Sequence, residues 1–125
     1  MKKTAAPKRH QGMNWIRPAK RLAIYLRDGL TCVWCGTAVE TGEGLTLDHL
    51  RCYSHGGGNE AANLVTSCRR CNSSRSTRSV AGFARVVAEY LDHGVQPESI
   101  VAHISRTRRR TLDMTAAHAM MARRG

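Results

Sequence analysis

The chain has 125 residues with a single Phe, a length and composition typical of one domain with a modest core. Its 20 Lys and Arg against 9 Asp and Glu give a formal net charge of +11, which indicates a polyanionic partner, usually nucleic acid. The sequence has no apolar run of about 18 residues and no apolar signal-peptide stretch, so we expect no membrane span and a cytoplasmic location.

Residues 1–17 are predicted to form a flexible basic arm, because they contain no acidic residue. The arm either touches phosphates or has no role, and the sequence leaves both open. A helix is predicted from Pro18 to Gly29, since Pro suits a first helical turn and Gly suits a helix end. A tight turn at residues 32–36 and a loop at residues 37–44 follow.

Residues 45–50 alternate and are β-prone, so they are predicted to form a strand. The loop at residues 51–62 contains three consecutive glycines, and a second short strand is expected at residues 63–67. A helix over residues 69–78 completes the order strand, long loop, strand, helix.

Three further helical segments are predicted after this unit. The first starts with Ser79 as a cap and ends at Gly94, the second runs from Pro97 through Ile104, and the third starts near Thr111. Core packing is expected of the apolar stripe Val80, Phe83, Val86, Val87, Tyr90 and Leu91, and of Met114, Met120 and Met121.

The cysteines form two C-x-x-C pairs, Cys32 with Cys35 and Cys68 with Cys71. A C-x-x-C turn points both sulfurs at one place, and two such turns provide the four ligands of a structural Zn²⁺ site with no open position. The predicted zinc site would hold the turn after the first helix against the start of the helix at residue 69. Cys52 is the odd cysteine, and we interpret it as a small, half-buried residue.

The sequence between these pairs resembles that of the HNH endonucleases. The shared pattern is C-x-x-C, Leu-Asp-His at residues 47–49, Gly-Gly, Asn-Leu at residues 63–64 and C-x-x-C-Asn at residues 68–72. The resemblance covers about residues 22–78. It implies an α+β fold, the small ββα-metal (His-Me finger) core of this family, in an HNN variant with a four-cysteine zinc site.

The resemblance also implies the role of each site residue. Asp48 matches the acid that binds a catalytic divalent ion, and His49 matches the general base that activates water. Asn63 matches the residue that braces the loop and helps to orient the histidine. Asn72 stands where the last histidine of the family stands, and its amide oxygen can bind the metal, although an amide is a weaker ligand than imidazole.

Phosphodiester hydrolysis needs a base for water and a cation for the charge that develops on the leaving oxygen. Adjacent residues on a strand point to opposite faces, so Asp48 can face the metal while His49 faces the water. An oxygen-rich ligand pair with open water positions suits Mg²⁺ or Mn²⁺. Each residue also has a simpler interpretation: a surface hydrogen bond for Asp48 and His49, a turn for Asn63 and a helix cap for Asn72.

Five arginines surround this predicted site and could hold the phosphates of the cleaved strand, although a solvated helix face explains them as well. They are Arg51, Arg69, Arg70, Arg75 and Arg78. His55 is expected to be a solvated loop histidine. No base-reading pattern is present, so no sequence preference is predicted.

The expected organisation is a basic arm at residues 1–17, a nuclease domain at 18–78 and a helical extension at 79–125. The expected activity is a one-metal DNA endonuclease that leaves 3′-OH and 5′-phosphate ends, encoded by a bacterium or phage for packaging, restriction or homing. The alternative is a zinc-ribbon module that binds nucleic acid without cutting it. The helical extension could also dock a protein partner.

Overall fold

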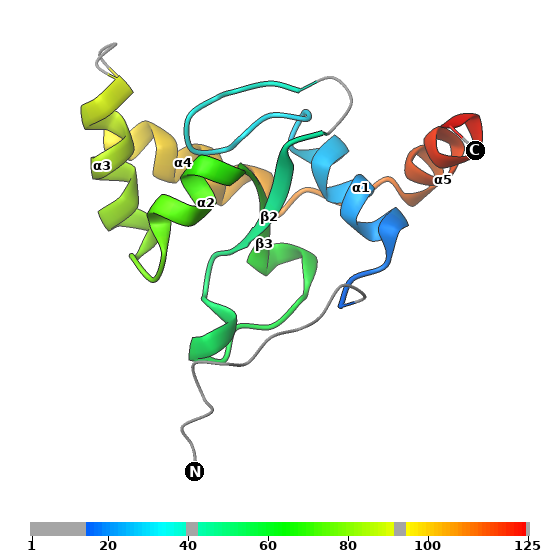
Figure 1. Ribbon diagram of the computed structural model, residues 1–125, viewed down its shortest axis with the longest axis horizontal. Coiled ribbons are helices and arrows are strands. Elements are labelled where there is room, and N and C mark those ends of the chain that lie inside the picture. Colours follow the sequence, from blue (N-terminus) through cyan, green and yellow to red (C-terminus); the bar gives the residue numbers. More distant parts are fainter. Residues whose placement is uncertain (1–14, 40–42, 92–94, 125) are drawn as a thin grey trace.

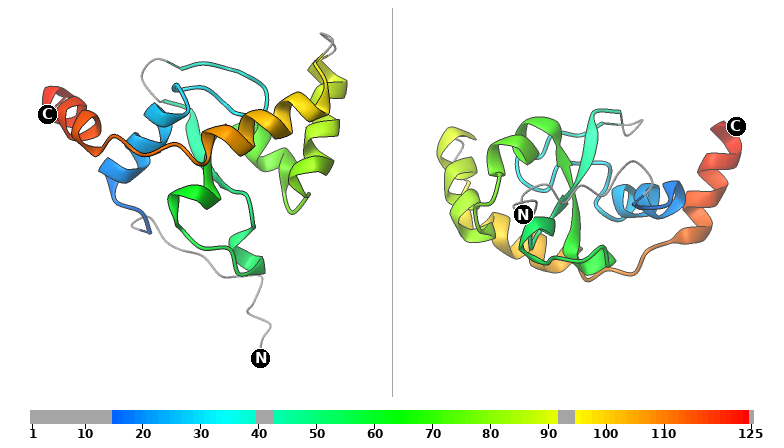
Figure 2. Two further views of the ribbon diagram at one scale, coloured as in Figure 1. Left: turned by 180° about the vertical axis from the view of Figure 1, so that it is seen from behind. Right: turned by 60° about the horizontal axis from the view of Figure 1, so that its bottom comes forward.

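The computed structural model describes residues 15–39, 43–91 and 95–124. The predicted basic arm falls mainly on residues 1–14, outside the described residues. A two-stranded antiparallel sheet lies at the centre, with α2, α3 and α4 on one side and α1 and α5 on the other (Figure 1). Two further views show the same arrangement, and in the left one, seen from behind, α4 (yellow-orange) runs across the front (Figure 2). No helix in the described part is long and apolar enough to cross a membrane.

The sheet is formed by β2 (Leu45–His49) and β3 (Leu64–Cys68). Leu45 lies opposite Cys68 and His49 lies opposite Leu64. Leu64, Val65, Thr66 and Ser67 are all buried, because helices cover both faces of this hairpin. The register places Cys68 and His49 at opposite ends of the hairpin, about 14 Å apart along the strands.

Helix α1 (Pro18–Arg27) begins at Pro18, as predicted. Gly29 follows it with a φ of +75°, a conformation that glycine adopts without steric cost. Leu22 and Tyr25 lie on its buried face, and Leu26 is half-buried. The start of the first helix was therefore predicted correctly, and the helix ends at Arg27, two residues before the predicted end.

Helix α2 (Arg69–Arg75) follows β3 without a loop. The Cys68 sulfur accepts a hydrogen bond from the Cys71 backbone N–H and caps the helix. The helix is shorter than the predicted span of residues 69–78, because Ser76 turns the backbone to a φ of +51°. This turn redirects the chain toward α3.

Helices α3 (Val80–Leu91) and α4 (Pro97–Thr107) complete one side of the molecule. Ser79 caps α3 as predicted, since its Oγ accepts a hydrogen bond from the Gly82 N–H. The buried residues Phe83, Val87, Ile100 and Ile104 pack in one cluster with Trp34, Val65 and two of the cysteines. The cysteine turns and the C-terminal helices therefore share a core.

Two residues of the predicted apolar stripe, Val86 and Tyr90, do not pack in the core, so the expectation for them was wrong. Val86 is 37% exposed and Tyr90 is 45% exposed, because the stripe is wider than the face that α4 and the cysteine turns cover.

Helix α4 continues to Thr107, three residues beyond the predicted end.

Helix α5 (Met114–Arg124) packs against α1 through the fully buried Ala117. It begins at Met114 rather than near Thr111, because the Asp113 carboxylate accepts a hydrogen bond from the Ala116 N–H. Met120 packs partly against the α1 cluster, whereas Met114 and Met121 are each 37% exposed and are not the packing residues that were expected.

A buried polar network joins α1, β3 and α4. The Asp28 carboxylate pairs with the Arg27 guanidinium at 2.8 Å and accepts hydrogen bonds from the Thr66 N–H at 2.9 Å and the Thr107 hydroxyl at 2.6 Å. Because both buried charges here are paired and hydrogen-bonded, the network fixes how the three elements meet. The predicted α+β class is confirmed, with two strands and a following helix at its centre.

Candidate metal centre and active site

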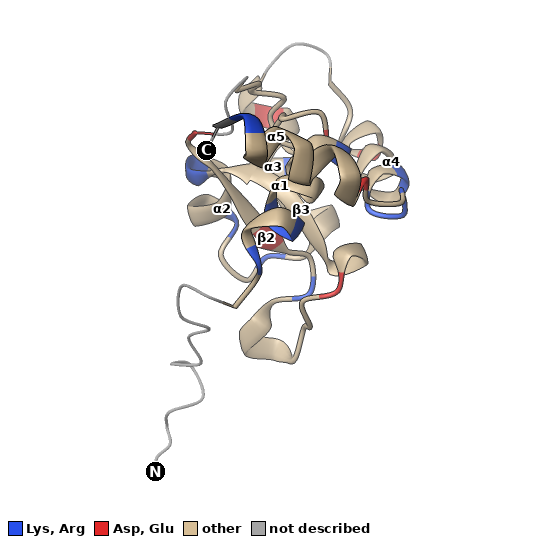
Figure 3. Ribbon diagram, turned by 90° about the vertical axis from the view of Figure 1, so that its right-hand side faces the viewer, with Lys and Arg blue, Asp and Glu red and all other residues tan. Residues whose placement is uncertain are grey.

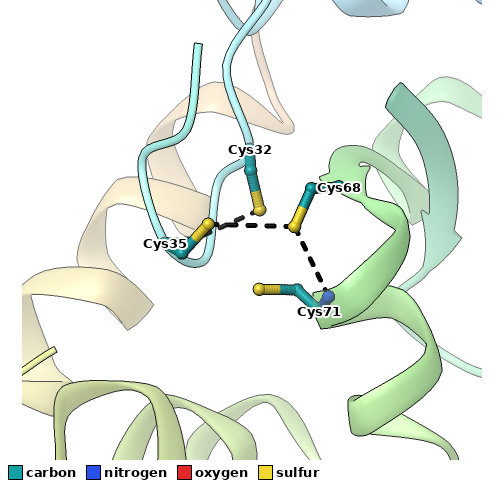
Figure 4. Close-up of side chains that lie close together, drawn as sticks. All are labelled: Cys32, Cys35, Cys68 and Cys71. Atoms are coloured by element: carbon teal, nitrogen blue, oxygen red, sulfur yellow. Dashed lines mark hydrogen bonds between the residues drawn. The ribbon is translucent and has the colours of Figure 1, made fainter. Parts of the chain in front are cut away.

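Four cysteines from two separate turns form one cluster, as predicted. Cys32 and Cys35 lie in the turn that the bridge between Thr31 and Ala38 closes. Cys68 ends β3 and Cys71 lies in the first turn of α2. Their four Sγ atoms lie within 4.8 Å of one another and point to a common centre (Figure 4).

Backbone donors shape both halves of this cluster in the same way. The Cys35 N–H points at the Cys32 sulfur at 3.5 Å, and the Cys71 N–H points at the Cys68 sulfur at 3.4 Å. Each C-x-x-C turn thus brings its own two sulfurs together, and the hairpin brings the two turns together. The four cysteines are positioned to form a metal site.

The cysteines of the cluster differ in their pKa values. A hydrogen bond from the Cys71 thiol lowers the pKa of Cys32 to about 4, and the same bond, with burial, raises the pKa of Cys71. Burial also raises the pKa of Cys68. The protein alone therefore favours a thiolate at Cys32 and the neutral thiol at Cys68 and Cys71, whereas a bound Zn²⁺ would stabilise four thiolates together.

Tyr90 and Arg70 lie at the outer edge of this cluster. The Tyr90 hydroxyl is 3.3 Å from the Cys71 sulfur, and the Arg70 guanidinium lies 5.4 Å from the centre of the Tyr90 ring. A hydroxyl donor and a nearby positive charge both stabilise thiolate at Cys71. Sequence reasoning assigned Tyr90 to the core and missed this contact, since nothing in the sequence links residues 71 and 90.

His49 lies at the other end of the hairpin in a separate environment. Its Nε2 atom is 2.8 Å from the Asn59 side-chain oxygen. The Trp15 ring lies 5.0 Å from the imidazole and the Tyr53 ring lies 6.0 Å from it, centre to centre. The imidazole is half-buried. Sequence reasoning missed Asn59, whose one signal is its place directly after three glycines.

Asn63 hydrogen-bonds to backbone groups on both sides of the loop after β2. Its side-chain oxygen accepts from the Arg51 N–H at 2.9 Å, and its Nδ2 donates to the Arg51 carbonyl at 3.1 Å and the Gly58 carbonyl at 2.8 Å. A buried amide with all these bonds made fixes both ends of the loop. These partners are backbone groups, so Asn63 acts on the loop that carries Asn59.

Asp48 points away from His49, as their adjacent positions on a strand require. The carboxylate accepts hydrogen bonds from the Trp34 Nε1–H at 3.0 Å and the Arg75 guanidinium at 2.6 Å. Asp48 is only 5% exposed, and this burial raises the pKa of its carboxyl, whereas Arg75 and Trp34 act in the opposite direction. Trp34 was not among the predicted site residues.

Arg75 is 1% exposed, which differs from the expectation that it contacts phosphates. Its guanidinium donates to the Asp48 carboxylate and to the backbone carbonyls of His49, Leu50 and Arg78. All of these bonds point inward, toward the end of β2 and the turn after α2. Arg75 therefore locks α2 against β2 and presents no charge to a DNA surface.

Asn72 lies one helical turn before Arg75 and is half-buried. Its Nδ2 donates to the Leu47 carbonyl at 3.2 Å, which places the amide beside the backbone of Asp48. Helix α2 thus holds Asn72 next to the strand segment that carries Asp48.

The remaining predicted arginines are exposed. They are Arg51, Arg69, Arg70 and Arg78. Figure 3 shows Lys and Arg spread over several helices and loops, with fewer Asp and Glu. Cys52 lies outside the cluster, with its sulfur 3.7 Å from the Ser76 carbonyl.

A comparison with known protein families found a match to the part of the chain that holds the cysteine cluster and His49. Residues 32–78 match the model of the HNH endonuclease family. The match begins at the first cysteine of the cluster and ends just after α2, so it contains both the cysteine cluster and His49. A search of curated proteins found no match. Residues 32–78 are therefore similar to an HNH endonuclease domain.

Proposed function

We propose that this HNH-like domain hydrolyses phosphodiester bonds of DNA with His49 as the general base. The observation that carries the proposal is the environment of His49: its half-buried imidazole lies 5.0 Å from the Trp15 ring and 6.0 Å from the Tyr53 ring, centre to centre, and its Nε2 atom is 2.8 Å from the Asn59 side-chain oxygen. A general base must keep a fixed direction toward the proton that it takes. A solvated surface histidine would have no such support.

In the proposed reaction, His49 takes a proton from a water molecule as that water attacks phosphorus. The bond from phosphorus to the 3′ oxygen breaks opposite the attacking water. The products are a 3′-OH and a 5′-phosphate. Asn63 keeps the loop in place during this step, because it ties Arg51 to Gly58 across the loop.

The donor set beside the strand fits a hard divalent ion. Asp48 offers a carboxylate, of which each oxygen keeps a further lone pair, and Asn72 offers an amide oxygen. Oxygen ligands of this kind suit Mg²⁺ or Mn²⁺, and the ion would supply positive charge for the leaving oxygen. Arg75 already balances the Asp48 charge, so we expect weak ion binding in the absence of DNA.

DNA binding would use the exposed arginines and the net charge of +11. Arg51 lies on the loop after β2, close to His49 in the sequence, while Arg69 and Arg70 lie at the start of α2. Contacts of this kind are made to phosphates, so affinity should fall steeply with salt and depend little on sequence.

A zinc-ribbon module that binds nucleic acid without cutting it is the second candidate. The buried ion pair of Asp48 with Arg75 favours it, because a neutralised carboxylate attracts a divalent ion less strongly. The cysteine cluster and the net charge fit this candidate equally well.

Plasmid nicking in the presence of Mg²⁺ or Mn²⁺ separates the two candidates. Wild-type protein should nick, and His49→Ala should lose activity by about 100-fold or more while it still binds DNA in a gel-shift assay. His118→Ala, on the exposed face of α5, is the matched control and should keep both activities. DNA binding by wild type and His49→Ala alike, with nicking by neither, would establish the non-catalytic module.

A further inference from the structure

The contact between Asn59 and His49 determines more than the position of the ring. We infer that Asn59 is a positioning residue that fixes the Nε2–H tautomer of His49 and so makes Nδ1 the nitrogen that takes the proton. The inference deepens the proposed nuclease function and, as a catalytic statement, rests on it.

The chemical argument starts from the atoms in contact. The Asn59 side-chain oxygen lies 2.8 Å from His49 Nε2. An amide oxygen only accepts hydrogen bonds, so the imidazole nitrogen opposite it must carry the hydrogen. A neutral imidazole has one N–H, and its lone pair is then on Nδ1.

Asn59 is itself held by neighbours on both sides of the loop. Lys20 of α1 donates from Nζ to the Asn59 carbonyl at 2.8 Å, and Asn63 donates to the carbonyl of the preceding residue, Gly58, at 2.8 Å. These bonds anchor the backbone of Asn59 to α1 and to the end of the loop. The side-chain oxygen therefore meets Nε2 from a fixed direction.

Gly57 makes this loop path possible. A Cβ atom at residue 57 would lie 1.7 Å from the Arg51 carbonyl oxygen and 3.0 Å from the Asn63 Nδ2. The chain passes too close to Arg51 for any side chain. Because the two sides of the loop come this close, the Asn63 Nδ2 donates to the Arg51 carbonyl on one side and to the Gly58 carbonyl on the other. Asn63 thus supports His49 through Gly58 and Asn59.

The aromatic rings restrict the imidazole further. Trp15 and Tyr53 lie 5.0 Å and 6.0 Å from its centre, tilted by 37° and 52°. They limit the rotation that would exchange the two ring nitrogens. The Asn59 oxygen then favours the tautomer with the hydrogen on Nε2, and the rings keep Nε2 directed at Asn59.

The proton transfer balances with this assignment. A water O–H bond breaks, its proton goes to Nδ1, the new oxygen–phosphorus bond forms, and the bond to the 3′ oxygen breaks. The leaving oxygen takes a proton from solvent. His49 becomes an imidazolium whose Nε2–H still donates to Asn59, and a charge-assisted bond of this kind is stronger than the neutral one.

The test uses the full chain with ¹⁵N-labelled histidine at about pH 8.5, where histidine is ordinarily neutral. The His49 ring resonances are identified by their loss in His49→Gln. Wild type should show Nε2 protonated and Nδ1 unprotonated. Asn59→Leu, which has a similar shape and no acceptor, should show a mixture of the two tautomers, and Asn59→Asp should restore the wild-type pattern because a carboxylate also accepts.

Nicking kinetics provide the second readout. Asn59→Leu should lower kcat by about tenfold to a hundredfold with KM nearly unchanged, and Asn59→Asp should recover most of the loss. Glu60→Gln, at the exposed neighbouring position, should match wild type, and the zinc content of each variant reports folding.

An Nδ1–H tautomer in wild type would overturn the inference, and so would an Asn59→Leu protein with unchanged tautomer and kcat. If wild type does not nick DNA, the proposed function fails, and the tautomer measurement alone decides whether Asn59 sets the state of His49.

Discussion

The cysteine cluster and the His49 environment lie at opposite ends of the same hairpin, and they are built in different ways. The cluster takes its four ligands from two short turns, each with its own backbone N–H to sulfur contact. His49 depends on an irregular loop, on α1 and on rings from Trp15 and Tyr53. The comparison shows that a closed site can be assembled locally, whereas this candidate catalytic site needs contacts from distant segments.

Loss of metal binding at the cysteine cluster should have the largest effect on the stability of the protein. Cys68→Ser or removal of zinc with a chelator should unfold the chain around the hairpin, because the four thiolates lose their common cation. Circular dichroism and bound zinc per chain measure the effect. Cys52→Ser is the matched control and should keep both, since Cys52 lies outside the cluster.

Phe83→Ala tests whether the C-terminal helices belong to the same core as the cluster. Phe83 is fully buried and meets the Trp34 ring edge-on, with 4.9 Å between ring centres. Its truncation should lower the free energy of unfolding by about 3–5 kcal/mol in urea titrations. Val86→Ala, on the same helix at an exposed position, should cost much less. Equal effects would show that α3 contributes little to the core.

Arg75→Met should leave the Asp48 carboxylate buried without its partner and lower stability by about 3–5 kcal/mol at neutral pH. Removal of the guanidinium should raise the pKa of Asp48 further above its ordinary value, since Arg75 now holds it down.

The pH dependence of that variant follows from this sign. Between the pKa of Asp48 in the unfolded chain and its higher value in the folded variant, only the unfolded chain loses the proton. Stability of Arg75→Met should therefore fall as the pH rises through this window, relative to Asp48→Asn/Arg75→Met. Parallel urea titrations across pH measure the difference, and identical pH profiles would contradict the assigned role of Arg75.

Gly57→Ala should act on the His49 end alone. The added methyl collides with the Arg51 carbonyl, so the loop must shift at a cost of about 1–3 kcal/mol. Nicking should fall while bound zinc stays at the wild-type level. Gly36→Ala in the first cysteine turn is a useful contrast, because a Cβ there would meet nothing within 4 Å and the φ of +82° alone strains the change. Nicking by Gly57→Ala at the wild-type rate would show that this path of the loop is not needed for catalysis.

Tyr90→Phe should have the smallest effect. It removes the hydroxyl next to the Cys71 sulfur and leaves the ring in place. Zinc affinity should fall by about tenfold in competition with a chelator, the lower end of effects for groups that support a metal ligand. Tyr53→Phe, at the His49 end, should leave zinc affinity unchanged. Equal zinc affinities for wild type and Tyr90→Phe would show that the Tyr90 hydroxyl does not support the metal site.

The sequence alone determined the repeated C-x-x-C pattern and the order of strands and helices, and the resemblance to HNH endonucleases singled out His49. The first two features are local: a cysteine turn, a proline at a helix start or a strand alternation depends on neighbours in the chain. The start of α1 at Pro18 and the cap at Ser79 were correct for the same reason.

Tertiary structure alone decided which side chains face one another. It paired Asp48 with Arg75, turned that arginine inward, and joined Asn59 to His49 and Tyr90 to Cys71. It also left Val86 and Tyr90 outside the core. Each of these outcomes depends on how elements far apart in the chain pack together, and a buried charge or a supported imidazole exists only once that packing excludes water.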